Sequence, residues 1–389
     1  MHTEDKEIRV LVVTSQYVRV ENGKVLVSAN TYDILKRFLY IGPLSIIGRT
    51  YHGKAATNID KEISEISPLN VRLISKSHIF VPNKYKRLID ETIQNNDLII
   101  GYVPDLNAEY GANAAKRYHK KYLSYVVGCT WDMLWNHSPK GKAIAPLAYF
   151  SLKRTLKKSD YALYVSQKFL QKRYPTNGLQ IGIGDVRITD HGDYILKNRL
   201  NKISKTNLSE RITLCTIGAV YVRYKGQQYV IEALGKLKQM GDTRFHYYLI
   251  GGGSQDYLLS VAKRWDVEEQ VHFMGIMPHS EIFAFMDSMD VCIHPSLTEG
   301  FSRCIVEAMS RATPCIATRA GAIPELLPNE CLFTAKSPDE IVKVLNNIDK
   351  EYLTRNAERN FLKSDNYTEI NLDKIRHQFF DKIKASIFN

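Results

Sequence analysis

The sequence predicts an α/β protein of two domains, each a doubly wound parallel sheet. Short apolar runs alternate with helical patterns along most of the chain, which is typical of repeated βαβ units. These runs are apolar on both faces, as parallel strands covered by helices are. The length of 389 residues is also that of two domains.

We place the first domain at residues 1–190. Its expected strands are 8–15, 44–50, 71–75, 97–103, 122–128 and 161–166. Its expected helices are 28–39, 83–95, 105–121 and 142–158. Ser28 and Asp105 stand at the start of two of these helices, where their side chains can accept a hydrogen bond from a first-turn amide.

The second domain, at 211–365, repeats the alternation. Its expected strands are 212–220, 246–253, 271–275, 290–296 and 314–318, and its expected helices are 227–240, 255–264, 279–288, 302–311 and 338–348. The polar residues 176–210 break the pattern, and we place the linker at 191–210. A last helical stretch, 366–389, follows no further strand and could pack back onto the first domain.

The net charge of +12 belongs entirely to the first half of the chain. Residues 1–200 hold 30 Lys and Arg against 18 Asp and Glu, whereas residues 201–389 hold 23 of each. A basic half suits anionic lipid, nucleic acid or a phosphorylated substrate, and a solvated face without a partner is the alternative. No nucleic-acid module is recognisable, so we expect no nucleic-acid partner. Two basic helix ends predict peripheral binding to an anionic membrane: Lys116, Arg117, Lys120 and Lys121, and Lys153, Arg154, Lys157 and Lys158.

The cysteines and the hydropathy exclude several other classes of protein. The six cysteines stand singly, without the spacing of a zinc site, and are expected to be buried reduced thiols. No apolar run has the length of a transmembrane helix, and the acidic N-terminus is unlike a signal peptide. We therefore expect a cytoplasmic protein, peripheral at the inner face of the membrane, with no bound metal and no cofactor.

The most informative segment is residues 294–327, HPSLTEGFSRCIVEAMSRATPCIATRAGAIPELL. Glu299 follows the carboxyl end of a buried strand, and Glu307 lies in the next helix, which Ser302 can cap. The free amides of Gly300, Phe301, Ser302 and Arg303 would make an anion site suited to a diphosphate. Two carboxylates beside a phosphate site suggest a nucleotide sugar; the alternative is a capped helix with two solvated acids.

Two further loops follow strands of the same domain. Arg223, Lys225 and Gly226 come after the strand at 212–220, where cations can neutralise a leaving diphosphate without a metal. No Asp-x-Asp pair occurs in the chain, which weakens the case for a metal clamp. Gly251, Gly252 and Gly253 allow close approach of backbone to a ligand, but they lack the spacing of a dinucleotide fingerprint.

These three segments, in this order, resemble the retaining glycosyltransferases of family four, with the GT-B architecture of two Rossmann-like domains facing a central cleft. The family's E-x7-E motif is present as Glu299 to Glu307, and its basic loop matches at Lys225 and Gly226. Ala219 stands where the family usually has an arginine, and Arg223 could replace it. The stretches Gly251–Gly253, His272–Gly275 and Ala320–Leu326 also match.

The resemblance implies the roles of these residues. Glu307 would hold the ribose hydroxyls and Glu299 the donor sugar, while Lys225, with Arg223, would hold the diphosphate. Met274 would border the base, and Gly23, in the loop after the first strand, would face the donor phosphates. On the acceptor side, Trp131 and Asp132 stand where family members often carry His and Asp, and His137 follows; these are the acceptor-side candidates.

We therefore expect a retaining, metal-independent glycosyltransferase. It would move a sugar from a nucleotide diphosphate sugar to a glycan or lipid-linked acceptor, as bacterial cell-surface polysaccharide enzymes do. The alternatives are a sugar-nucleotide epimerase, a phosphorylase of the same architecture, or a non-catalytic glycan-assembly partner.

Overall fold

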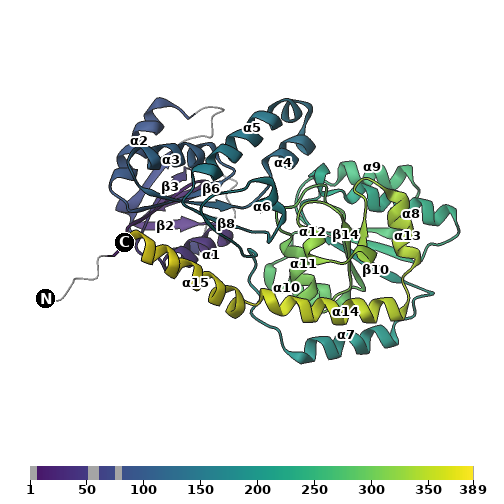
Figure 1. The fold of residues 1–389 in the computed structure, drawn as a ribbon. Coiled ribbons are helices and arrows are strands. Elements are labelled where there is room, and N and C mark those ends of the chain that lie inside the picture. The colour runs from purple at the N-terminus through teal and green to yellow at the C-terminus, as the bar shows by residue number, and fades with distance from the viewer. Residues whose placement is uncertain (1–6, 51–60, 75–80, 389) are drawn as a thin grey trace. The chain divides into compact units, whose positions relative to one another are not determined.

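The computed structural model describes residues 7–50, 61–74 and 81–388. Contacts divide the chain into two compact units (Figure 1). Unit 1 comprises residues 1–134, 142–183 and the C-terminal segment from Lys374, and unit 2 comprises 135–141 and 184–373. The doubly wound α/β fold expected from the sequence is present in both.

Unit 1 is built on one mixed sheet. Its strands are β1 (Val10–Glu21), β2 (Lys24–Val27), β3 (Leu44–Arg49), β4 (Lys61–Glu62), β5 (Val71–Ile74), β6 (Leu98–Val103), β7 (Lys121–Val126), β8 (Tyr161–Tyr164) and β9 (Leu179–Gly182). The parallel part has the order β5-β3-β1-β6-β7-β8-β9, and β2 and β4 extend it by antiparallel pairing at the end of β1. The helices are α1 (Ala29–Phe38), α2 (Asn83–Gln94), α3 (Leu106–Arg117), α4 (Thr130–His137), α5 (Pro139–Lys158) and α6 (Phe169–Arg173).

Helices cover both faces of the unit 1 sheet, with α3 on one face and α1 and α15 (Glu369–Phe388) on the other (Figure 1). Tyr122 and Tyr125 of β7 lie three positions apart, so their side chains point to opposite faces of the sheet. The Tyr122 hydroxyl donates to the carbonyl of Ala108 in α3. The Tyr125 ring instead meets Phe38 of α1 edge-on, with centroids 5.7 Å apart, and Phe38 contacts Phe380 of α15.

One expectation for unit 1 is wrong in detail. The first strand does not end near residue 15 but continues to Glu21, and Asn22 and Gly23 form the turn into β2 with left-handed φ angles of 50° and 73°. Asn-Gly favours such two-residue hairpin turns. Gly23 therefore lies at a hairpin turn and not in a loop at the end of a parallel strand. The caps expected at Ser28 and Asp105 are confirmed, because each side chain accepts a first-turn amide.

Unit 2 is built on a fully parallel sheet with the order β12-β11-β10-β13-β14-β15. Its strands are β10 (Ile212–Ile217), β11 (Phe245–Ile250), β12 (Val271–Gly275), β13 (Val291–His294), β14 (Cys315–Thr318) and β15 (Leu332–Phe333). Its helices are α7 (Asp193–Lys205), α8 (Gln227–Gln239), α9 (Asp256–Arg264), α10 (His279–Ser288), α11 (Arg303–Ser310), α12 (Ile323–Leu326), α13 (Pro338–Asn346) and α14 (Lys350–Ser364). Helix α8 packs with α9 and α13, and α14 packs with α7 and α11.

The stretch expected as a linker, 191–210, is mostly helix α7 of unit 2. Polar composition suggested a linker, but α7 buries Ile195 and Ile203 and, between them, Arg199. Its guanidinium donates to the carbonyl oxygens of Met286 and Met289 and to the Thr313 hydroxyl. The chain passes between the units at both ends of the short segment 135–141, after Ile183, and again near Lys374, within α15.

Two findings concern the cysteines and membrane spans. All six cysteines are free; Cys304 is half-buried and the other five are buried. Within the described ranges, no helix combines the length and the apolar character that crossing a membrane would require.

Candidate functional site

The candidate site lies where the unit 2 sheet changes its winding direction. Strands β10 and β13 are neighbours, but the chain builds β11 and β12 on one side of them and β14 and β15 on the other. Ligands of such sheets bind outside the carboxyl ends of the strands at this point. The two loops there are joined, because the Leu297 amide donates to the Tyr224 carbonyl at 2.8 Å. Gly226 has φ 75°, and any side chain there would collide with the Pro295 carbonyl.

Three charged side chains from these loops meet in what we call the Glu299 cluster: Lys225, His294 and Glu299. Lys225 Nζ and His294 Nε2 each lie 2.9 Å from Glu299 Oε1. The Glu299 side chain is only 12% exposed and that of His294 only 4%. Lys225 comes from the short 3₁₀ turn after β10, and His294 is the last residue of β13.

The charges of the Glu299 cluster follow from its contacts. Burial raises the pKa of Glu299, but His294 and Lys225 outweigh it and lower that pKa to about 2. Burial lowers the pKa of His294, whereas Cys304 and Glu299 raise it, to about 9. Lys225 also has a raised pKa, because the Glu299 charge outweighs its burial. At neutral pH Glu299 is therefore ionised and faces two basic side chains.

The N-terminus of α11 opens beside this cluster. Ser302 caps the helix, as expected, by accepting the Ile305 amide, and its hydroxyl lies 3.3 Å from His294 Nε2. Among the described residues, the amides of Gly300 and Phe301 find no hydrogen-bond acceptor. Two basic side chains next to free amides and a helix N-terminus are suited to an anion such as a diphosphate.

The loop after β14 fixes the backbone of Glu299. The Ala322 amide donates to the Glu299 carbonyl at 3.1 Å. Gly321 has φ 55°, and a Cβ there would collide with the Glu299 carbonyl. This contact gives a physical reason for glycine in the Ala320–Leu326 turn.

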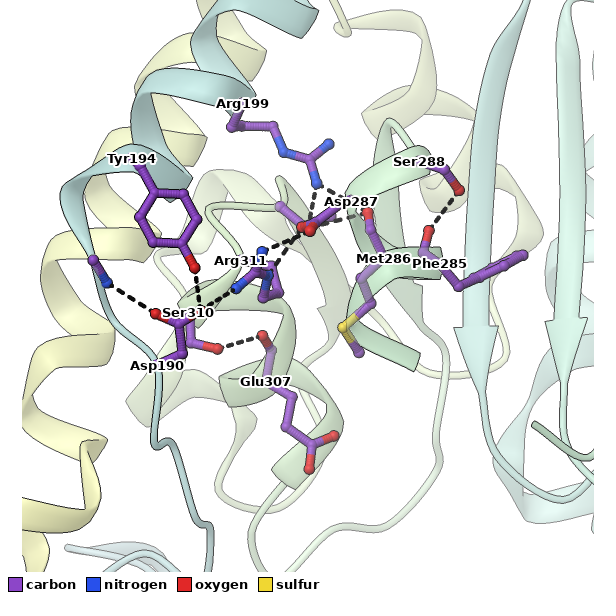
Figure 2. A network of polar contacts seen from close by, with 12 residues as sticks. Asp190, Tyr194, Arg199, Phe285, Met286, Asp287, Ser288, Glu307, Ser310 and Arg311 are labelled. Carbon is purple, nitrogen blue, oxygen red and sulfur yellow. Dashed lines mark hydrogen bonds and ion pairs between the residues drawn. The ribbon is translucent and has the colours of Figure 1, made fainter. Parts of the chain in front are cut away.

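Glu307 lies in α11, with its side chain 16% exposed and its carboxylate 3.5 Å from His279 Nε2. The end of its helix is anchored, because Arg311 pairs with Asp287 at 2.6 Å and with Asp190 at 3.4 Å. Figure 2 shows this network and the Glu307 side chain extending away from it. Glu307 is therefore held in place by its backbone, with its carboxylate turned away from the ion pairs that anchor the helix.

The remaining donor-side residues take different positions. Arg223 does not join the Glu299 cluster; its guanidinium stacks over the Tyr257 ring of α9, 4.3 Å from the centroid. Gly251–Gly253 pack on the loop after β10, where the Val220 amide donates to the Gly252 carbonyl at 3.1 Å. Met274 is 43% exposed at the end of β12, and the Phe301 ring contacts Tyr367. Arg303, the first residue of α11, is exposed.

The acceptor-side candidates begin in unit 1, after β7. Asp132 pairs with Arg173 at 2.7 Å, and Trp131 lines a cavity with aromatic residues of α5 and α6. His137 is exposed at the end of α4.

Sequence reasoning missed His294. It was read only as the end of a buried strand, yet it supplies one of the two cations on Glu299. The available signal was its position, since it ends a parallel strand five residues before the glutamate.

Within the described residues, no group of three or more His, Cys, Asp and Glu side chains is placed so that it could hold a metal ion.

Comparison with known proteins assigns the family. Residues 211–349 match the family described as Glycosyl transferases group 1. Protein CapJ of Staphylococcus aureus is 30% identical over 307 residues, which cover 77% of this chain and 75% of CapJ. The O-antigen biosynthesis glycosyltransferase WclY of Escherichia coli is 25% identical over 181 residues, or 46% of this chain and 49% of WclY. The chain belongs to the group 1 glycosyltransferases.

Solved structures agree with this family. Alr3699/HepE of Anabaena, in complex with UDP, matches with a TM-score of 0.66 at 16% identity, over 97% of this chain and 100% of that one. A glycosyltransferase of Rickettsia africae gives 0.63 at 16% identity, over 99% of both chains. At these identities the likeness establishes the fold, so the GT-B class expected from the sequence is confirmed.

The charge of His294 predicts a pH-dependent stability. Because its pKa is raised from 6.5 to about 9 in the folded protein, its contribution is complete below about pH 6.5 and is lost as the pH rises through 9. We expect the stability advantage of wild type over His294→Gln to shrink as the pH rises over this range. Thermal melts from pH 6 to 10 measure it, with exposed His137→Gln as the control. An advantage that stays the same at every pH would show that folding does not raise the pKa of His294.

Proposed function

We propose that this protein is a retaining, metal-independent glycosyltransferase of cell-surface polysaccharide biosynthesis. Its donor would be a nucleotide diphosphate sugar and its acceptor a glycan or lipid-linked glycan. The observation that carries the proposal is the Glu299 cluster, in which a lysine and a histidine meet one largely buried carboxylate at the switch point of the unit 2 sheet. The UDP bound to HepE and the O-antigen pathway in the name of WclY support the donor and the pathway.

The cluster suits the departure of a diphosphate. As the bond from the anomeric carbon to the phosphate oxygen breaks, negative charge grows on that oxygen. Lys225 and the amides of Gly300 and Phe301 would offset this charge without moving, which is the main source of catalysis at such sites. His294, together with Lys225, offsets the charge of the ionised Glu299.

Retention follows if the acceptor hydroxyl attacks from the side that the diphosphate leaves. The hydroxyl oxygen bonds to the anomeric carbon, and its proton passes to the leaving phosphate oxygen. No protein base is required in this step, and the chain's own part is to orient the donor and stabilise charge. Glu299 would hold a donor-sugar hydroxyl, and Glu307 the ribose.

Helix α5 supports the membrane part of the proposal. Near its end, Lys158 is repelled electrostatically by Arg154 and by Lys116 on α3, so the two basic helix ends form one patch. The same helix exposes Ile144, Leu147 and Phe150, of which Leu147 is 75% exposed. Basic and apolar side chains together on one surface helix favour the interface of an anionic membrane.

The two glutamates are expected to have separable effects. Glu299→Gln removes a contact that strengthens as the sugar gains positive charge, so it should lower kcat about ten- to a hundredfold. Glu307→Gln removes a contact equal in both states and should raise the donor KM by a similar factor. Steady-state kinetics measure both, with exposed Glu358→Gln on α14 as the control.

Calorimetry with the nucleoside diphosphate gives an independent check on these roles. Glu299→Gln should bind it at least as well as wild type, since the cluster loses its only anion, and Glu307→Gln should bind it more weakly. The reverse pattern would exchange the two roles.

Turnover is expected to survive chelation, because Lys225 and His294 supply the positive charge at the site. Initial rates are compared in EDTA and in added Mg²⁺, after the protein has been dialysed. A complete loss of activity that Mg²⁺ restores would contradict the proposed role of the cations.

Binding to anionic vesicles is expected at low salt and should weaken at high salt, because each cation near the surface adds about 1 kcal/mol. Arg154→Glu with Lys157→Glu should abolish most of it, whereas Lys263→Glu, an exposed change on α9, should not. Vesicle sedimentation measures the bound fraction. Equal, negligible pelleting with anionic and neutral vesicles would refute the membrane proposal.

A further inference from the structure

Unit 1 contains a cavity of about 570 Å³ lined by three aromatic residues and two cations. The lining residues are Trp131, Tyr149, Phe169, Lys172 and Arg173. We call it the aromatic cavity. Trp131 is one of the acceptor-side candidates, and the other four lining residues have no role assigned above.

The topology places this cavity at the carboxyl edge of the unit 1 sheet. Trp131 follows β7, and Phe169, Lys172 and Arg173 follow β8, which is parallel to β7 and paired with it. The carboxyl ends of neighbouring parallel strands lie at the same edge, where open α/β sheets bind ligands. The cavity therefore occupies a binding position and is not a packing defect of the core.

The rings of the cavity are held in place. The Tyr149 hydroxyl donates to the Arg173 carbonyl at 3.3 Å, and the Trp131 and Tyr149 rings are nearly perpendicular, with centroids 5.9 Å apart. The Trp131 amide is tied to the Tyr174 hydroxyl. Fixed aromatic walls with a few polar groups are typical of small-molecule sites, and ring faces suit the apolar C–H faces of sugars.

The charge of the cavity is positive. Arg173 is partly compensated by Asp132, but Lys172 is exposed and has no ion-pair partner among the residues described. Lys153 adds a third cation, 5.6 Å from the centroid of the Tyr149 ring. An anionic group seated against the rings would find Lys172 available for a charge-assisted hydrogen bond.

We propose that the aromatic cavity binds a sugar that carries an anionic group, a carboxylate or a phosphate, as part of the acceptor. Calling this sugar an acceptor rests on the proposed function, whereas the binding of an anionic sugar in the cavity does not. The rings would hold the sugar face, and Lys172 would select for the charge. Both sources, an acidic sugar and a sugar phosphate, share this chemistry.

Binding of three small probes to the full chain tests the proposal: methyl glucuronide, glucose 1-phosphate and neutral methyl glucoside. Saturation-transfer NMR titrations give the affinities. We expect at least one anionic probe to bind about tenfold more tightly than the neutral one, and Lys172→Gln to remove that difference. The probe that gains identifies the source of the charge.

Matched variants separate this site from the Glu299 cluster. Lys225→Gln should weaken nucleoside diphosphate binding and leave methyl glucuronide binding unchanged. Lys172→Gln should weaken methyl glucuronide binding and leave nucleoside diphosphate binding unchanged. Lys197→Gln, exposed on α7, should change neither. If the proposed function is wrong, Lys225→Gln will not weaken nucleoside diphosphate binding. If the cavity proposal is wrong, Lys172→Gln will not weaken methyl glucuronide binding.

Trp131→Leu should weaken all three probes several-fold, the neutral one included, because it removes a ring wall. A thermal melt shows whether this variant folds, and the Lys172 result stands without it. The proposal is overturned if anionic and neutral probes bind wild type equally, if none binds, or if Lys172→Gln binds them as wild type does.

Discussion

The structure of the candidate site depends on keeping one buried carboxylate ionised. Glu299 is largely shielded from water, and an unpaired charge there would be very costly. Lys225 compensates it from the loop after β10 and His294 from the end of β13, so these two segments must stay in register. The close approach of Gly226 to Pro295 and of Gly321 to Glu299 follows from the same requirement, because the three loops meet around one side chain.

This arrangement also explains how the second half of the chain, which has no excess charge, can attract an anion. The second half of the chain has equal numbers of acidic and basic residues, yet at the switch point two basic side chains face one carboxylate. The helix N-terminus and the amides of Gly300 and Phe301 add partial positive charge in the same direction. Local geometry, not net charge, gives the site its polarity, whereas the excess charge of unit 1 lies on its surface.

The sequence predicted much of unit 2 because the relevant signals are local. The buried strand before Glu299, the Ser302 cap and the helix with Glu307 all follow from neighbouring residues. The role of His294 could not be derived, since it depends on a lysine from a different loop that reaches the same carboxylate. Helix α7 was missed because its buried positions, Ile195, Arg199 and Ile203, stand apart in a polar stretch and the arginine among them looks like a surface residue. The Asn-Gly pair at Gly23 is a local hairpin signal, whereas the family resemblance implied only a loop that faces the donor phosphates.

Helix α15 changes the order in which the protein can be completed during synthesis. Its buried Phe379, Phe380 and Ile383 belong to the core of unit 1, whose other elements precede residue 184. A ribosome therefore makes the whole of unit 2 before unit 1 receives its last helix, and the apolar face around Phe38 has to wait for it. Unit 2 has most of its contacts in one continuous stretch and can form first, so the unit that begins the chain is the last to be finished.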